Sequence, residues 1–343
     1  MDAKITKKRL AHMLSYDWVK VIAVIVAAII VWSLIFTTTA TRITNTQRFV
    51  VCNYLGMNFG KAGNLGDYSY EIIEAERVDN VRGGENMFSQ LFAGNIEIGE
   101  GDVMLVSDYH TSREVKKDEN GNEIKDSEDK PVYEYSEATY LSQALTYYYA
   151  NFTRLDDGDD SKGFFTQMKE YLGRFYNLTS EEAKTYGDAV LTKAVFDKDS
   201  LNEELAESEF RARIKANKDK RFKKEEQIEA GVLQEIARIE AYLNAYNEFF
   251  TYLDNGYIAL TVKTLQITET FSVTGAYGIN LCPNEQTMGS MKEQYYYVDF
   301  DGLVTAKNIN ATFLNLKELD KDFQYENLIF INTMVKSFCT ELR

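Results

Sequence analysis

A short loop near residue 107 carries the side chains with the clearest potential for chemistry. The segment FSQLFAGNIEIGEGDVMLVSDYH, residues 88–110, ends in Ser107, Asp108, Tyr109 and His110. His110 is the only histidine after the first forty residues, so a histidine-dependent mechanism in this part of the chain would have to use it. A solvated loop residue beside Tyr109 is the simpler interpretation of His110.

The motifs that usually accompany catalysis are absent from the sequence. It contains no nucleophile elbow, no HExxH helix and no CxxC pair. The glycine-rich stretch GMNFGKAGNLG, residues 56–66, fits neither GxGxxG nor GxxxxGK[ST], and strand-like residues follow it instead of a helix. Glycosidase-type carboxylate pairs stay open, because the many acidic residues do not reveal their separation. We therefore predict a protein that is not an enzyme and needs no cofactor.

Two acidic loops resemble calcium loops in composition but not in spacing. Asp118, Asn120 and Asn122 alternate as calcium ligands do, yet glutamate follows where the EF-hand loop requires glycine. In DDGDDSKG, residues 156–163, the glycine falls one place late. The dipeptide Asn120-Gly121, between two polar extended arms, is typical of a hairpin turn. We predict no metal site and a hairpin at residues 111–135.

Charge and cysteine content limit the partners of the chain. It has 53 Asp and Glu against 38 Lys and Arg, and its first forty residues are basic, so the remainder is strongly acidic. Such a surface disfavours nucleic acid, whose recognition depends on neutralising phosphates. Cys52, Cys282 and Cys339 are widely spaced and predict neither a disulfide framework nor a metal site.

One basic run, RARIKANKDKRFKK at residues 211–224, reverses the sign of this acidic part. Contact with an anionic surface, such as lipid head groups, is one interpretation of this run. We favour internal pairing, because Glu207 and Glu209 lie four residues before two of the arginines. The contact would use Arg211, Arg213, Lys215, Lys220, Arg221, Lys223 and Lys224 of this run.

The start of the chain predicts a membrane anchor. Val21 to Phe36 is an unbroken apolar run, and its flanks extend it to residues 18–40, which is enough to cross a bilayer. The preceding residues 1–17 are basic, which predicts a cytoplasmic tail and an extracytoplasmic main domain in a single-pass plasma membrane protein. A signal peptide cleaved after Ala40 is the alternative; we favour the uncleaved anchor because the apolar run is longer than a usual signal core.

Hydrophobic periodicity divides the remaining chain into three parts. The first predicts strands at residues 48–54 and 102–106, a strand or strand pair at 68–78, and a helix at 85–92 that Gly94 would end. The middle, residues 136–256, predicts helices, one starting at Thr179 and one whose apolar side chains run from 228 to 253. After Gly256 the period becomes 2, which predicts strands, and a helix at 325–342 closes the chain.

Three segments carry a resemblance to a known family. QLFAGNIEIGEGDVMLVSD is similar to the helix-to-strand crossing of extracellular solute-binding proteins with the type 2 periplasmic-binding fold, where the strand ends at the cleft between two lobes. TGAYGINLCP resembles the strand that returns to the first lobe, and ENLIFINTMVKSFCTEL resembles the closing helix. With its N-terminal span, the chain most resembles the membrane-anchored members found in Gram-positive Firmicutes.

The resemblance implies an α/β fold with two lobes. Residues 48–110 and 257–343 would form one α/β lobe, and residues 136–256 a mostly helical second lobe or insertion. A small polar ligand or a peptide segment would lie between the lobes, against side chains that follow strand ends: Asn53, Tyr54, Asn58, Ser107, Asp108, Tyr109 and Tyr277.

The chain also departs from the family. It has only two prolines, no lipobox cysteine and a charged middle segment, which leaves transport open. One alternative is a structural or assembly component of an envelope complex that uses the helical segment as a protein-interaction surface. Another is a carboxylate-dependent glycan hydrolase.

Overall fold

A computed structural model of the protein describes residues 7–39, 48–60, 77–82, 87–158, 161–316 and 324–342. The chain divides into two units, Met1–Thr44 and Asn45–Arg343. Residues 61–66 of the glycine-rich stretch and residues 68–76 of the expected strand segment 68–78 lie outside the described residues, while residues 77–78 are in a strand.

The first unit contains a single long helix, α1 (Lys7–Thr39). Within it, Trp18–Ile35 is strongly apolar, with Lys20 as its one charged residue, and its side chains are exposed. Eighteen residues in a helix span about 27 Å, close to the roughly 30 Å of a bilayer's hydrocarbon core. The expected N-terminal apolar helix is therefore present, and it is long and apolar enough to cross a membrane.

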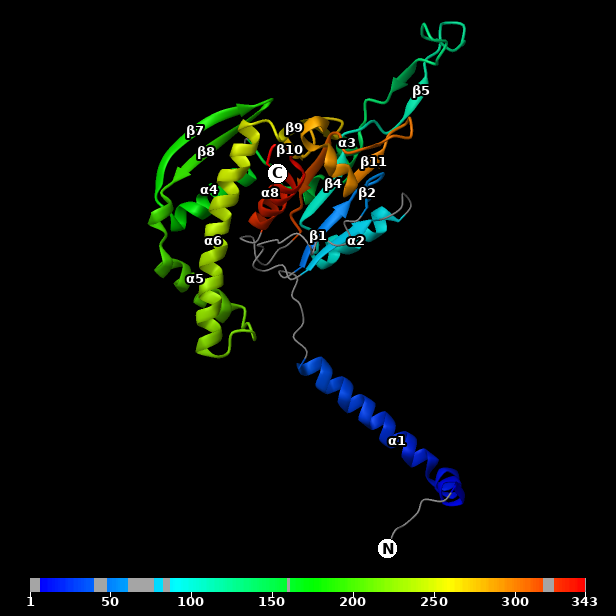
Figure 1. The fold of residues 1–343 in the computed structure, drawn as a ribbon, viewed down its shortest axis with the longest axis vertical. Helices are drawn as coiled ribbons and strands as arrows, with labels where there is room; N and C mark the ends of the chain where they lie inside the picture. Colours follow the sequence, from blue (N-terminus) through cyan, green and yellow to red (C-terminus); the bar gives the residue numbers. More distant parts are fainter. Residues whose placement is uncertain are drawn as a thin grey trace. The chain divides into compact units, whose positions relative to one another are not determined.

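A six-stranded mixed sheet forms the centre of the second unit (Figure 1). Its order is β3-β1-β4-β13-β10-β9, with β1 parallel to both β3 and β4 and the other neighbours antiparallel. Early and late segments of the chain thus share one sheet. The strands are β1 (Arg48–Asn53), β3 (Arg77–Arg82), β4 (Val103–Ser107), β9 (Ala259–Thr268), β10 (Phe271–Asn280) and β13 (Ile309–Phe313).

Helices cover both faces of this sheet, which explains the uninterrupted apolar run in β4. Val103 and Leu105 belong to one apolar cluster, while Met104 and Val106 belong to another. The first cluster also contains side chains of α4 (Phe164–Phe175), α6 (Glu225–Asp254) and α8 (Glu326–Phe338). The second contains side chains of α2 (Phe88–Ile98) and α3 (Tyr140–Tyr147).

Helix α2 is longer than the sequence predicts. It continues through Gly94 and ends at Gly99, whose φ of +68° and backbone N–H, bonded to the carbonyls of Asn95 and Ile96, form a left-handed C-cap. The prediction that Gly94 ends the helix is wrong. A helix interior tolerates glycine at a cost of about 1 kcal/mol, which the burial of Phe88 and Phe92 offsets.

The predicted helix at Thr179 is also wrong, because this segment is a β-hairpin. Strand β7 (Leu178–Tyr186) pairs with β8 (Ala189–Phe196), and the two-residue turn between them contains Gly187 with a φ of +62°. Strand β8 buries Leu191 and Phe196 in the same apolar cluster as α4 and α6, while nearly all of β7 is exposed. Burial of one strand against the helices thus overrides the cap-like Thr-Ser-Glu-Glu pattern.

Residues 111–135 form a projecting arm (Figure 1). Its base is β5 (Arg113–Val115) paired with β6 (Tyr133–Tyr135). The predicted turn at Asn120-Gly121 is confirmed, since Gly121 N–H donates to the carbonyl of Asp118 at 3.0 Å. A second turn follows, in which Asp129 N–H donates to the carbonyl of Asp126 at 3.1 Å.

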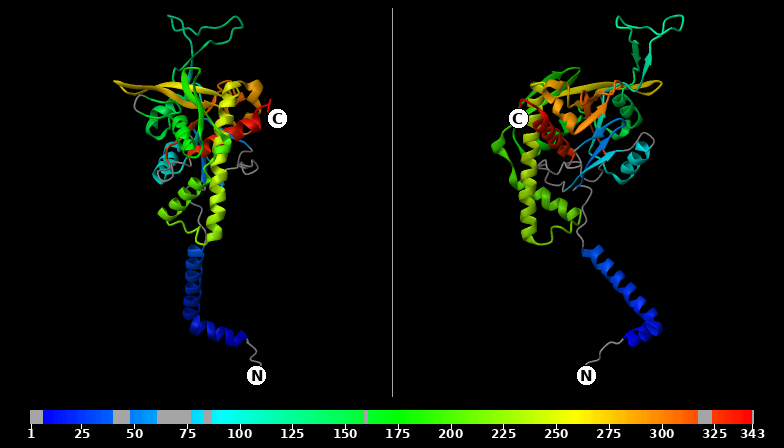
Figure 2. Two further views of the ribbon diagram at one scale, coloured as in Figure 1. Left: turned by 90° about the vertical axis from the view of Figure 1, so that its left-hand side faces the viewer. Right: turned by 45° about the vertical axis from the view of Figure 1, so that its right-hand side comes forward.

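Smaller elements complete the second unit. A three-stranded sheet orders β12-β11-β2, and α5 precedes α6 in a helical hairpin (Figure 2). These elements are β2 (Asn58–Phe59), β11 (Tyr295–Val298), β12 (Val304–Thr305), α5 (Glu203–Ala216) and α7 (Glu285–Met288), with short 3-10 helices at Tyr149–Asn151, Lys198–Ser200 and Gly289–Glu293.

Candidate functional site

The carboxyl ends of β1 and β4 meet at one edge of the sheet, because the two strands are parallel neighbours. This places Asn53 and Tyr54 beside Ser107 and Asp108, as sequence reasoning expects. Asn53, Tyr54 and Ser107 are nevertheless at most 2% exposed, and the Tyr54 hydroxyl donates to Gln143 Oε1 at 3.4 Å. These three side chains are part of the interior.

Tyr277 and Asn58 occupy separate positions. Tyr277 lies at an irregularity in β10, is 2% exposed, and its ring centroid is 6.2 Å from that of Tyr149. Asn58 is on β2, where its Nδ2 donates to the carbonyl of Gly56 at 2.9 Å. Neither side chain is shown in contact with the Ser107–His110 loop.

Asp108 is paired inside the protein. Its Oδ1 is 2.8 Å from Lys263 Nζ of β9, and its backbone N–H donates to the carbonyl of Asn308 at 2.9 Å. On the same strand as Lys263, Thr261 Oγ1 donates to Asn310 Oδ1 at 2.6 Å. Gly278 leaves room for this contact, because a Cβ there would lie 2.6 Å from Asn310 Oδ1. Asp108 and Asn310 thus pair with side chains of β9 where the cleft was expected.

Tyr109 lies in a more open environment. Its ring centroid is 5.0 Å from that of Phe300 and 5.2 Å from that of buried Tyr297, and its hydroxyl accepts from Phe300 N–H at 3.3 Å. Burial raises the pKa of Tyr109, so the phenol stays neutral at physiological pH.

His110 extends this aromatic group to the base of the arm. Its ring centroid is 5.1 Å from that of Tyr135, which is 6.1 Å from Phe300, and its Nδ1 lies 2.6 Å from the carbonyl oxygen of Ser136. Tyr135 is 42% exposed. We call Tyr109, His110, Tyr135 and Phe300 the aromatic platform.

Arg113 fixes the platform to the arm. Its guanidinium carbon lies 4.1 Å from the centroid of the Tyr133 ring and 5.3 Å from that of Phe300. Its Nη2 donates to the carbonyl of Phe300 at 2.7 Å, and Nη1 lies 2.7 Å from Asp301 Oδ1. A hydrogen bond to Asp301 raises the pKa of Arg113. The group therefore joins flat apolar faces to one fixed cation.

The platform continues into an exposed apolar hairpin. Phe300 lies in the turn between β11 and β12, and the same hairpin exposes Val298, Leu303 and Val304 by 50% or more. Aromatic faces beside a cation suit stacking and hydrogen bonding with a ligand. Within the described ranges, no group of three or more His, Cys, Asp or Glu side chains is placed to hold a metal ion.

Sequence reasoning named Tyr109 as a candidate but not the side chains of the arm and of the β11–β12 turn that lie near it. Tyr133 and Tyr135 alternate with a glutamate at the end of the polar arm, and Phe300 lies in the turn-like stretch VDFDGL. Alternating tyrosines at the base of a hairpin were the available signal.

A pocket of about 560 Å³ lies elsewhere, between the end of α4 and the start of α5. Its lining includes Arg174, Asn177, Asn202 and Glu203, and none of the predicted site residues.

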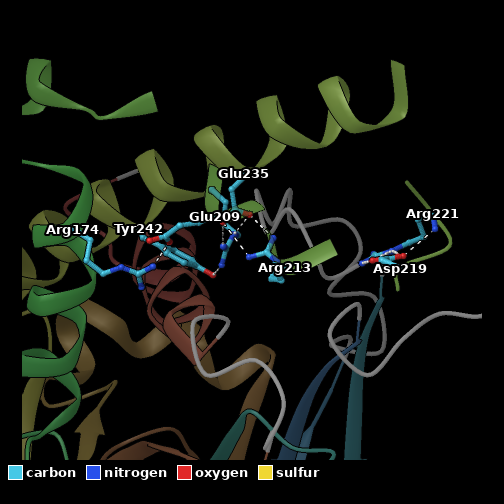
Figure 3. A network of polar contacts seen from close by, with 8 residues as sticks. Arg174, Glu209, Arg213, Asp219, Arg221, Glu235 and Tyr242 are labelled. Atoms are coloured by element: carbon cyan, nitrogen blue, oxygen red, sulfur yellow. Dashed lines mark hydrogen bonds and ion pairs between the residues drawn. The ribbon is translucent and has the colours of Figure 1, made fainter. Parts of the chain in front are cut away.

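The basic run is divided between paired arginines and exposed lysines. Figure 3 shows two of the arginines, Arg213 and Arg221. Arg211 lies 2.7 Å from both Glu207 and Glu225, and Arg221 lies 2.7 Å from Asp219. The pairing of Glu207 with Arg211 is confirmed. That of Glu209 with Arg213 is wrong, as the next network shows.

Ion pairs join α5 to both α4 and α6, and those around Glu235 of α6 are the most buried (Figure 3). Glu209 contacts Arg174, while Arg213 Nη2 lies 2.7 Å from Glu235 Oε2. Glu235 also pairs with Arg238, which is 1% exposed and donates from Nη1 to Tyr242 Oη at 3.2 Å. Burial alone would raise the pKa of Glu235, but the two guanidinium groups outweigh burial and lower it.

The comparisons add no relative to this picture. No protein-family model, no curated protein and no solved structure matches the chain, so the resemblance to solute-binding proteins stays a prediction from three short segments.

Proposed function

We propose that this chain is a membrane-tethered, non-enzymatic binding protein whose extracytoplasmic unit holds a peptide segment on the aromatic platform. The observation that carries the proposal is the continuous series of rings from Tyr109 to exposed Tyr135, held in place by Arg113. The apolar helix α1 supplies the tether, and the basic residues before it support an extracytoplasmic orientation.

A peptide suits this surface better than an enclosed small solute. Most of the side chains expected to line a solute cleft are buried or paired, whereas Tyr135 of the platform and three apolar side chains of the adjoining hairpin are exposed. Aromatic rings bind apolar side chains by stacking, and Arg113 can donate to a peptide carbonyl or carboxylate. Closure of two lobes is not required, because one apolar cluster joins strands of the sheet to α4, β8 and α6.

A second candidate is an assembly component of an envelope complex. It is favoured by the projecting arm, most of whose side chains are exposed. An arm of this kind presents a large surface to a partner protein while contributing little to the core. In that case the bound peptide segment would belong to the partner.

Peptide binding can be measured on an array of immobilised twelve-residue peptides of random sequence. The wild-type protein in detergent is compared with Tyr135→Ala and with the control Tyr147→Ala, which removes a tyrosine that is 69% exposed on α3 and outside the platform. We expect Tyr135→Ala to weaken binding about tenfold or more, the loss typical of a central aromatic contact, and the control to leave it unchanged.

Two outcomes would oppose the proposal. Equal losses from both substitutions would mean that the platform does not select the peptides. Cleavage of bound peptides, detected by mass spectrometry, would contradict a non-enzymatic role.

A further inference from the structure

Five exposed lysines surround the connection between α5 and α6. Among the described residues, none of them forms an ion pair, although the neighbouring arginines all do. We call these lysines the lysine tip: Lys215, Lys218, Lys220, Lys223 and Lys224.

The backbone of the tip holds these charges in a fixed turn. Lys218 has a φ of +50°, a left-handed conformation that glycine or asparagine adopts more readily than lysine. Its N–H donates to the carbonyl of Lys215 at 3.3 Å, and Asp219 N–H donates to that of Ile214 at 3.0 Å. At this position lysine therefore costs more conformational free energy than glycine would.

Aromatic packing fixes the tip to the helices. The ring of Phe222 meets that of Phe210 edge to face, with centroids 5.0 Å apart. Gly231 of α6 makes room for them, because a Cβ there would lie 2.4 Å from Phe210 and 2.6 Å from Phe222. The lysines therefore project from a rigid support.

The tip lies at the end of its unit where the chain enters. Within residues 45–343, the α5–α6 connection lies toward the end of the unit from which β1 starts (Figures 1 and 2). In the chain, β1 is the first strand after the apolar helix α1. The cationic end of an otherwise acidic unit is thus the end from which β1 starts.

We propose that the lysine tip docks on the anionic head groups of the membrane that α1 spans. Each lysine near such a surface attracts anionic lipid over about one Debye length, roughly 10 Å at 0.1 M salt. Pairing of the arginines with acids inside the hairpin leaves the lysines available for this contact. Docking would hold the unit against the lipid independently of any ligand on the aromatic platform.

The test uses the full chain in lipid nanodiscs, either of phosphatidylcholine alone or with about a third phosphatidylglycerol. Asn217→Cys places a nitroxide label among the lysines, while the three native cysteines are buried. Contact between label and head groups is measured by collision with a nickel-chelating lipid. We expect contact to increase with phosphatidylglycerol and to disappear near 1 M salt, where the Debye length falls to roughly 3 Å.

Replacing all five lysines of the tip by glutamine should reduce the phosphatidylglycerol-dependent contact at least tenfold. The matched control, Lys116→Gln with Lys117→Gln, removes two exposed lysines of the arm and should change nothing. Circular dichroism checks that the glutamine variant is folded.

Equal contact in both kinds of nanodisc would overturn the proposal, as would a folded glutamine variant that keeps full contact. Soluble polyphosphate is added to phosphatidylcholine nanodiscs as a further arm. Suppose that polyphosphate shields the label from collision with the nickel-chelating lipid, while phosphatidylglycerol does not increase that collision. An anionic polymer is then the occupant of the lysine tip, and lipid docking is wrong.

Discussion

Glu235 provides the sharpest test of how the helical hairpin is held together. Replacing it by glutamine keeps the size of the side chain but removes the carboxylate that pairs with Arg238 and Arg213. Arg238 would keep its contact with Tyr242 Oη but lose this anion, in a position that is 1% exposed.

The size of the effect follows from that burial. Removing one partner of a buried ion pair costs about 3–5 kcal/mol, because the remaining charge stays desolvated. Glutamine still offers an amide oxygen to the guanidinium, so we expect the free energy of unfolding to fall by about 3 kcal/mol, the lower limit of this range. With a urea m-value of about 3 kcal/mol/M, the unfolding midpoint would fall by about 1 M.

The measurement is urea unfolding of residues 45–343, followed by circular dichroism. Glu229→Gln is the matched control, because it removes an exposed carboxylate from the same helix and should change stability by less than about 0.5 kcal/mol. If Glu235→Gln costs no more than this control, Arg238 does not depend on the carboxylate and the reasoning is refuted.

The pH dependence gives an independent check. Because the folded-state pKa of Glu235 is lowered, its charge adds stability above its unfolded pKa, and this is lost as pH falls through the folded pKa. The stability difference between wild type and Glu235→Gln should therefore be full at pH 7 and shrink below about pH 4. A difference that stays constant down to pH 3 would contradict an ionic origin.

Two further predictions concern thiols and helix glycines. Burial raises the pKa of both Cys52 and Cys282 to about 12, and Cys339 is also buried. A thiol reagent at pH 8 should therefore label none of the three until denaturant is added, and rapid labelling of the native protein would contradict this burial. Gly231→Ala should destabilise the protein by about 1–2 kcal/mol, because two phenyl rings occupy the space of the added Cβ. Gly94→Ala should stabilise it by about 0.5–1 kcal/mol, because nothing lies within 4 Å of the added Cβ. Thermal melting temperatures that shift in the same direction in both variants would refute this contrast.

The main sheet and the long helix were predictable because their patterns are strong. Strand β4 is buried on both faces, so it appears in the sequence as an unbroken apolar run. Helix α6 repeats its apolar side chains at steps of three and four and ends beside Gly256, which has a φ of +71°. In both elements local propensity and tertiary burial agree.

The hairpin β7–β8 was missed because local propensity and tertiary burial disagree in this segment. Its polar strand β7 starts with residues typical of a helix cap, and only packing of β8 against α4 and α6 makes it a strand. The turn Gly187-Asp188 was the local signal that could have revealed it.

The aromatic platform was missed because of strand register. The bridge between Lys117 and Glu123 would, if extended, place Arg113 opposite Ser127. The second turn of the arm shifts the register, so Arg113 pairs with Tyr135 instead. Nothing in the composition of the arm indicates two turns instead of one. The number of turns nevertheless decides whether Arg113 lies opposite Ser127 or opposite Tyr135.

The pairing of β4 with β13 has a consequence for synthesis of the chain. Ser107 lies opposite Ile309, so the ribosome adds about two hundred residues after β4 before its neighbour exists. At roughly 5–20 residues per second this delay is about 10–40 s. During that time an apolar strand offers an unpaired edge to any other extended chain nearby. The nascent protein should therefore depend on chaperones that shield such edges more than its final stability suggests.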